Sequence, residues 1–131
     1  YSRGDYAVLP TNNLDLETPY SAQNVTDVGS DNTVRVAQTG TGEFMIHQFK
    51  DWVGTNTSWV LVWNGQSTVA PSTAHVFLDI WDINGGEWKN LVEYDAGSAN
   101  TDFTITTTIS LDLDHYKDVN NIITCRVYQQ A

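Results

Sequence analysis

Hydrophobic and polar residues alternate with a period of two along much of this chain, and this pattern predicts β-strands. The clearest case is residues 102–111, where Phe, Ile, Thr or Leu at odd positions alternates with Asp, Thr or Ser at even positions. β-Branched side chains are stiff about χ1 and suit a pleated, half-buried surface. No stretch keeps the i, i+3, i+4 spacing of an amphipathic helix over three turns. The pattern therefore predicts an all-β protein.

Shorter runs of the same kind predict six further strands. A turn-forming sequence at 82–87, Asp-Ile-Asn-Gly-Gly-Glu, is expected to join two of them as a hairpin. Residues 58–63 are apolar on both faces, which is typical of a central strand covered on both sides. Residues 112–121 are expected to form a polar connection with a short helical turn around Tyr116. The further strands are predicted at 33–38, 43–49, 58–63, 75–81, 88–94 and 122–129.

Strands with an apolar face must bury that face, and two packed sheets achieve this. We expect residues 33–131 to form a β-sandwich of two antiparallel sheets. An immunoglobulin-like arrangement would carry a Cys…Trp…Cys framework, which this chain lacks. A jelly-roll-like arrangement fits at least as well.

Residues 1–32 differ from the rest of the chain. They are polar, contain two of the three prolines and show one short strand-like run at 6–9. We expect an extended N-terminal segment, for which two interpretations stay open. It is either a linker or edge strand that lies on its own sandwich, or an arm that pairs with a neighbouring copy.

The charge of the chain excludes several classes of partner. Sixteen acidic residues stand against six scattered Lys and Arg, which gives a net charge of −10. This leaves no electrostatic footprint for nucleic acid and disfavours anionic lipid surfaces. No apolar run approaches the roughly 18 to 20 residues of a membrane span, so membrane insertion is not expected either.

The composition also bears on location. The chain is rich in Thr, Asn and Ser and has a single cysteine, Cys125, so it can form no intrachain disulfide and no cysteine-based zinc cluster. This composition is typical of a bacterial, archaeal or viral exterior, and we expect an extracellular, cell-surface or virion-surface location. Because the chain begins at Tyr1, we expect either a removed leader or excision from a longer protein.

Four motifs carry a resemblance to a known group of proteins. They are Trp-x-Leu-x-Trp-x-Gly at 59–65, Phe-Leu-Asp-Ile-Trp-Asp at 77–82, Trp-Lys-Asn-Leu at 88–91 and Cys-Arg-Val-Tyr at 125–128. From Phe44 to Tyr128, about two-thirds of the chain, the sequence resembles jelly-roll accessory modules that accompany catalytic and adhesive domains on secreted microbial proteins. Many such modules are similar to carbohydrate-binding modules. The resemblance implies a jelly-roll fold, glycan binding and a structural calcium ion.

Aromatic residues are the candidate ligand-binding groups. A sugar ring has an apolar face that stacks on flat aromatic rings and a rim of hydroxyls that needs polar partners. Phe77 and Trp81 share the strand face opposite the expected core residues. If the second sheet covers that face, however, the same side chains belong to the core. The candidate residues are Trp52, Phe77, Asp79, Trp81, Asn84 and Trp88.

Calcium binding and catalysis remain to be weighed. Asp112, Asp114 and Asp118 flank a loop and supply the oxygen ligands that calcium prefers, although a solvated acidic loop would have the same composition. The three histidines lie on separate segments, and no nucleophile motif such as Gly-x-Ser-x-Gly is present. We therefore expect no catalytic residues and no enzymatic activity.

These observations lead to two hypotheses. The first is a non-catalytic extracellular β-sandwich module that binds a glycan through surface aromatic residues. The alternative is a structural subunit of an extracellular filament or virion surface, in which residues 1–32 pair with a neighbouring copy. The expected partners are accordingly a glycan or other copies of the chain.

Overall fold

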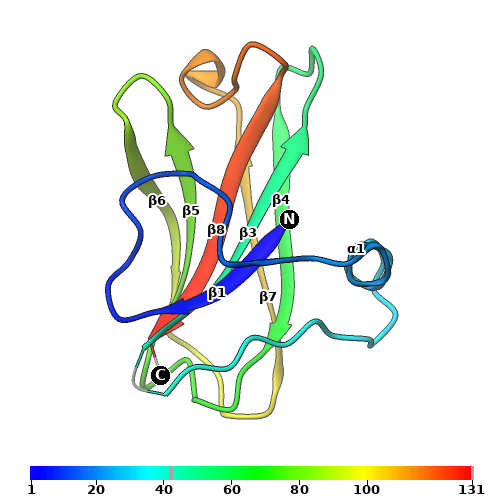
Figure 1. Cartoon of the computed structure of the whole chain (residues 1–131), viewed down its shortest axis with the longest axis vertical. Helices are drawn as coiled ribbons and strands as arrows, with labels where there is room; N and C mark the ends of the chain where they lie inside the picture. The colour runs from blue at the N-terminus through cyan, green and yellow to red at the C-terminus, as the bar shows by residue number, and fades with distance from the viewer. Residues whose placement is uncertain (42, 131) are drawn as a thin grey trace.

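The computed structural model describes residues 1–41 and 43–130, and it shows two antiparallel sheets. The larger sheet has six strands in the order β2-β1-β3-β8-β5-β6, and the smaller sheet consists of β4 and β7 (Figure 1). The expected all-β sandwich is thus confirmed. The elements are β1 (Ser2–Tyr6), β2 (Thr18–Pro19), α1 (Ala22–Val28), β3 (Phe44–Trp52), β4 (Trp59–Gln66), β5 (Val76–Asp82), β6 (Glu87–Tyr94), β7 (Asp102–Ile109), a 3-10 turn η1 (Leu113–His115) and β8 (Ile122–Gln130).

Two details of the predicted strands are wrong. Residues 33–38 alternate like a strand but lie in irregular structure, and in the described residues they pair with no other strand. Residues 58–63 were expected to be covered on both faces, yet Val60 and Val62 of β4 are 65% and 59% exposed. Both errors have one cause, because alternation describes the side chains of a segment and carries no information about its hydrogen-bonding partners.

The short helix α1 was not expected from the sequence. It begins at Ser21, whose side chain accepts from the Asn24 backbone N–H while the Asn24 side chain accepts from the Ser21 N–H. This reciprocal capping satisfies two of the free donors of the first turn. The helix buries none of its residues, so it has no apolar stripe by which hydrophobic periodicity could have revealed it.

The core lies between the two sheets, on the faces that strand alternation predicts. Apolar side chains on the inner faces of β5 and β8 pack against apolar side chains on the inner faces of β4 and β7. Cys125 is among them, and burial raises the pKa of its thiol. The buried core residues are Val53, Trp59, Val76, Leu78, Ile80, Ile105, Ile109, Ile123, Cys125 and Val127.

In the described part of the chain, no helix is long and apolar enough to cross a membrane.

The N-terminal residues first form a strand of the six-stranded sheet and then cross its outer face. β1 pairs with β3 of the same chain, from Ser2 opposite Gln48 to Tyr6 opposite Phe44, so the strand precedes the run predicted at 6–9. Residues 7–17, which we name the strap, then cross in front of β5, β6 and β8 (Figure 1). Leu16 in the strap is only 6% exposed. The strap therefore buries part of the outer face of this sheet and forms a second packed layer there.

Backbone carbonyl groups of the strap are held by side chains of the sheet. Gln48 Nε2 donates to the Leu14 carbonyl at 2.9 Å, and Arg126 Nη1 donates to the Pro10 carbonyl at 2.8 Å. The Leu16 N–H donates in turn to Ser2 Oγ at 2.9 Å. The strap has no secondary structure of its own, so these side chains satisfy groups that a sheet would otherwise have paired.

A buried ion pair lies beneath the strap. Arg126 of β8 donates from Nε and Nη2 to Asp79 Oδ2 on β5, at 3.0 and 2.8 Å. Asn90 of β6 donates to the other carboxylate oxygen at 3.1 Å. The side chains of Arg126 and Asp79 are only 6% and 4% exposed. Because water hardly reaches either side chain, the Arg126 charge is balanced mainly by the Asp79 carboxylate.

Removal of one partner of this pair should destabilise the fold strongly. We expect Asp79→Ala to lower the free energy of unfolding by about 3–5 kcal/mol, because the Arg126 charge then stays buried without a counter-ion. The matched control is Asp102→Ala, which breaks the exposed pair with Arg35 and should cost less than about 1 kcal/mol. Urea denaturation followed by tryptophan fluorescence measures both values. Similar losses in the two variants would contradict the role assigned to the buried pair.

Candidate functional site

The three candidate tryptophans lie on the outer face of the six-stranded sheet. Trp81 of β5 and Trp88 of β6 are directly opposite each other in the strand register. Their rings are half-buried and meet edge to face, with centroids 5.3 Å apart. Trp52 is the last residue of β3, opposite Ile122 of β8. Since the preceding pair places Ile123 in the core, Trp52 points to the outer face.

Trp52 is the most accessible aromatic group of this face. Its side chain is 74% exposed, and its ring lies against the backbone of Gly54. Gly54 has a φ of +58°, and a methyl group there would come within 2.9 Å of the Trp52 ring. Glycine is therefore required both for the turn and for the position of the indole. The strand spacing and register place Trp52 about 12 Å from Trp81 along this end of the sheet.

Trp88 is held in place from two sides. Its indole N–H donates to the Asn12 carbonyl of the strap at 3.1 Å. The Arg126 guanidinium lies over its ring, 4.3 Å from the centroid. A cation over an aromatic face is an attractive arrangement, stronger where water is excluded. Trp88 thus acts as a fixed support for Trp81, and its own ring face is occupied.

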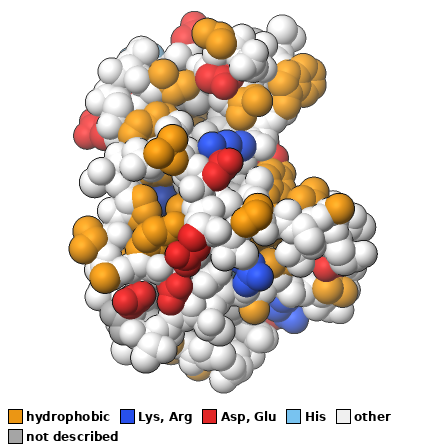
Figure 2. All heavy atoms as spheres, in the orientation of Figure 1, with side chains coloured by type: hydrophobic (Ala, Val, Ile, Leu, Met, Phe, Trp, Pro, Cys, Tyr) orange, Lys and Arg blue, Asp and Glu red, His pale blue; other side chains and the backbone are white. Residues whose placement is uncertain are grey.

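The other candidate residues are distributed differently. Asn84 is exposed in the turn that joins β5 to β6, next to the tryptophan pair. Asp79 is buried and fully engaged by Arg126 and Asn90. Phe77 stacks on Tyr128 with centroids 5.1 Å apart, at the opposite end of β5. The sequence-based set is therefore brought together only in part, as Trp52, Trp81, Asn84 and Trp88. Figure 2 shows this face of the molecule, where apolar side chains lie in separate groups among charged ones.

The expected calcium ligands do not converge. The Asp114 carboxylate pairs with Lys117 at 2.9 Å. Asp118 accepts from the backbone N–H groups of Asn120 and Ile122 at 2.8 and 2.9 Å, which shapes the turn before β8. Asp112 is exposed and precedes η1 with a φ of +54°. Among the described residues, no three His, Cys, Asp or Glu side chains lie close enough to hold a metal ion. Calcium binding therefore stays a prediction without support from the geometry.

A groove that sequence reasoning missed lies on the other side of the sheet. The two-stranded sheet covers the inner face of β1 and β3 only in part, through Trp63 of β4. The resulting groove has a volume of about 1030 Å³ and is bordered by β4 and by residues 27–40. Five of its aromatic side chains contact one another, and we name these five the groove floor. They are Tyr1, Tyr20, His47, Phe49 and Trp63.

The groove floor is a continuous set of ring contacts. Trp63 lies 5.3 Å from His47 and 5.4 Å from Phe49 between ring centroids. Tyr1 meets Phe49 edge to face at 5.1 Å, and Tyr20 packs against both His47 and Phe49. These residues come from four separate segments of the chain. Trp59, on the same face of β4, is buried in the core at 5% exposure, whereas Trp63 is half-buried and packs against the edge of the core.

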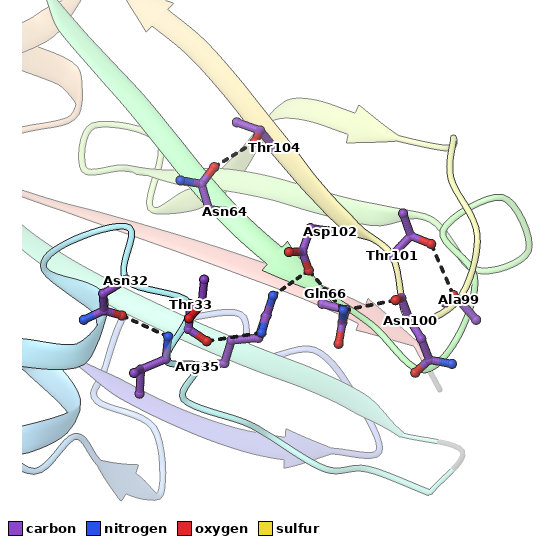
Figure 3. Close-up of polar contacts among 11 residues, drawn as sticks. Asn32, Thr33, Arg35, Asn64, Gln66, Ala99, Asn100, Thr101, Asp102 and Thr104 are labelled. Carbon is purple, nitrogen blue, oxygen red and sulfur yellow. Dashed lines mark hydrogen bonds and ion pairs between the residues drawn. The ribbon is translucent and has the colours of Figure 1, made fainter.

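Polar side chains border the groove at one end. Arg35, from the irregular segment after α1, reaches Asp102 of β7 at 2.6 Å, and Gln66 of β4 donates to the same carboxylate oxygen at 3.0 Å (Figure 3). Further along, Thr104 donates to Asn64 at 2.7 Å. Arg35 thereby ties the segment after α1 to the ends of β4 and β7.

His47 is a titratable group of the groove floor whose pKa is lowered. Burial, with a contribution from the Arg3 charge, lowers its pKa from 6.5 to about 4. The Tyr20 hydroxyl is hydrogen-bonded to its Nδ1. His47 is therefore a neutral ring near pH 7, and it forms part of an uncharged aromatic surface.

No protein-family model, no curated protein and no solved structure matches this chain.

The lowered pKa of His47 should make the stability of the fold depend on pH. Between pH 6.5 and about 4 the unfolded chain binds a proton on this ring that the folded chain does not bind. The free energy of unfolding should therefore fall as the pH is lowered from 7 to 4, by on the order of 2–3 kcal/mol from this residue. Denaturation of His47→Gln across this range should give a smaller slope than the parent chain. Thr106→Ser, an exposed substitution that changes no titratable group, should keep the parent slope, and equal slopes in all three chains would contradict the assignment.

Proposed function

We propose that this chain is a non-catalytic extracellular module that binds a neutral glycan on the outer face of the six-stranded sheet. The observation that carries the proposal is the exposed Trp52 ring, which shares that face with the rigid Trp81–Trp88 pair. Flat indoles offer stacking surface for the apolar face of sugar rings, and a ring already fixed by its neighbours loses little entropy on binding.

Polar groups lie between and beside these indoles. Lys50, on the same face of β3, pairs with Asp15 of the strap at 2.7 Å, and the Asp15 side chain is 74% exposed. The Asn84 amide and the Asn12 carbonyl border the tryptophan pair. Amide, carboxylate and ammonium groups are suitable partners for sugar hydroxyls. The net charge of −10 favours a neutral ligand over an anionic one.

The proposal includes a jelly-roll connectivity. After β3 the chain passes to the smaller sheet at β4, returns to the larger sheet at β5 and β6, and repeats the passage through β7 to β8. Alternation of successive strands between two sheets supports a jelly roll over an arrangement of simple hairpins. The extracellular location rests on composition and on the resemblance, and it is part of the same proposal.

Assembly into a filament or virion surface is the second candidate function. It is favoured by the N-terminal segment, because β1 joins the larger sheet only by pairing with β3, which lies about 40 residues further along the chain. The same strand could pair with β3 of a neighbouring copy and so link the two copies. Light scattering over a hundredfold concentration range tests this function. A constant monomer mass would contradict it, whereas growth in mass that stops when Gly4→Pro is introduced in β1 would support it.

Loss of the exposed indole should weaken glycan binding without affecting the fold. We expect Trp52→Ala to reduce the affinity for a neutral oligosaccharide about tenfold, since aromatic stacking contributes about 0.5–1.5 kcal/mol beyond the burial of apolar area. The melting temperature should stay unchanged, because the side chain is 74% exposed. A glycan array finds the ligand, and calorimetry at low and high salt should give equal affinities for a neutral sugar.

The control for this variant is Val60→Ala, which removes an exposed apolar side chain from the smaller sheet. It should bind like the parent chain. The absence of any neutral glycan ligand, or equal affinities of Trp52→Ala and the parent, would contradict the proposed site.

A further inference from the structure

β4 has one paired edge and one open edge. All eight of its residues, Trp59–Gln66, are in register with β7. Within residues 1–41 and 43–130, no other strand pairs with it. Alternate N–H and C=O groups of β4 therefore point away from the sheet with no strand to receive them. Such an edge is a template for the addition of another strand.

The other sheet edges carry features that discourage strand addition. β6 has Glu87, Lys89 and Glu93 along its length, and the opposite end of the larger sheet is the two-residue β2 with Pro19. Charges, proline and short length are the usual protection of an edge strand. β7 lies beside β6, where Phe103 stacks on Tyr94 at 4.9 Å. β4 contains neither a charged residue nor a proline, so its edge lacks this protection.

The open edge of β4 borders the groove along seven of its eight residues, 60–66. Eight residues of strand measure about 26 Å, and the groove follows β4 with a volume of about 1030 Å³. Residues 33–38 cross near the end of β4 but, in the described structure, form no ladder with it. Arg35 holds this segment to Asp102 instead (Figure 3). The space beside the edge is therefore left for a different segment.

The charges around the groove favour a basic occupant. Among the described lining residues, four carboxylates, those of Asp27, Asp31, Asp51 and Asp102, stand against one Lys or Arg side chain, that of Arg35. The charge of Arg3 also acts on the groove floor, so the acidic groups outnumber the basic ones by four to two. Arg35 is already paired with Asp102. A second copy of the chain would bring another net charge of −10 to this acidic surface, which opposes self-association.

We propose that the open edge of β4 binds an extended basic peptide of a partner protein, which adds as a third strand to the smaller sheet. Its backbone would hydrogen-bond to β4. Alternate side chains would then point toward the groove floor, where Phe49 and Trp63 accept apolar groups or the aliphatic stems of Lys and Arg. The remaining side chains would lie beside Val60 and Val62 on the exposed face. This site is separate from the proposed glycan site, and neither proposal depends on the other.

Synthetic peptides test the proposal directly. The probe is a blocked octapeptide of alternating Val and Lys, and its affinity is measured by calorimetry at low and high salt. We expect binding that weakens as salt is raised. The same peptide with Glu in place of Lys should bind at least tenfold more weakly. Peptides N-methylated at alternate residues, prepared in both registers, should lose affinity in the register whose N–H groups face β4.

Two variants of the chain locate the binding edge. Val62→Lys places a positive charge beside the open edge at a position that is 59% exposed, and it should weaken binding of the basic peptide at least tenfold. Thr106→Lys is the matched control, because Thr106 is exposed and lies directly opposite Val62 on β7, one strand further from the edge. It should change the affinity less than threefold. Trp52→Ala should leave peptide binding unchanged, which separates this site from the glycan site.

Several outcomes would overturn the proposal. These are no binding of the basic peptide, equal binding of the basic and acidic peptides, or undiminished binding of both N-methylated forms. Self-association that Val62→Lys abolishes, without peptide binding, would identify a second copy as the occupant instead. Competition between the peptide and a neutral glycan would assign the groove to the glycan.

Discussion

The buried pair of Arg126 and Asp79 connects the parts of this protein that are distant in sequence. Arg126 bonds to a carboxylate on β5, to a backbone carbonyl of the strap, and to the face of Trp88 through its charge. Every hydrogen-bonding nitrogen of its guanidinium is thus used. Because neither charge is hydrated, the arrangement is stable only when β5, β8 and the strap are all in place. The buried ion pair is therefore stable only when the strap packs on the outer face of the sheet.

The strap in turn decides which part of the outer face is available to a ligand. Residues 7–17 cover the middle of the sheet, where Ile46 and Gln48 are fully buried. Trp52 and the turn after β5 lie beyond the strap and stay accessible. The carbonyl group of Asn12 also orients the Trp88 indole. A candidate glycan surface at one end of the sheet is thus a consequence of how the N-terminal segment is held.

The unequal size of the two sheets leaves part of the inner face of the larger sheet open. Six strands present more surface than two strands can cover, so the inner face of β1 and β3 is covered only in part. Aromatic side chains fill this region only partly and leave a groove. The same imbalance leaves β4 with an open edge. A single feature of topology therefore produces both the concave surface and the hydrogen-bonding groups beside it.

Local patterns were sufficient for the strands and their inward faces, because side-chain alternation is a property of a few consecutive residues. Val76, Leu78 and Ile80, like Ile123 and Val127, lie in the core as their alternation predicts. Trp81 and Trp88 could likewise be placed near each other from the sequence, because they flank the predicted turn of one hairpin. The sequence by itself thus determined the all-β class, the core residues of the main strands and the acidic surface. Only the tertiary structure decided the pairing of β1, the irregular path of residues 33–38, the burial of Asp79 and the groove floor, because each depends on partners that lie tens of residues away.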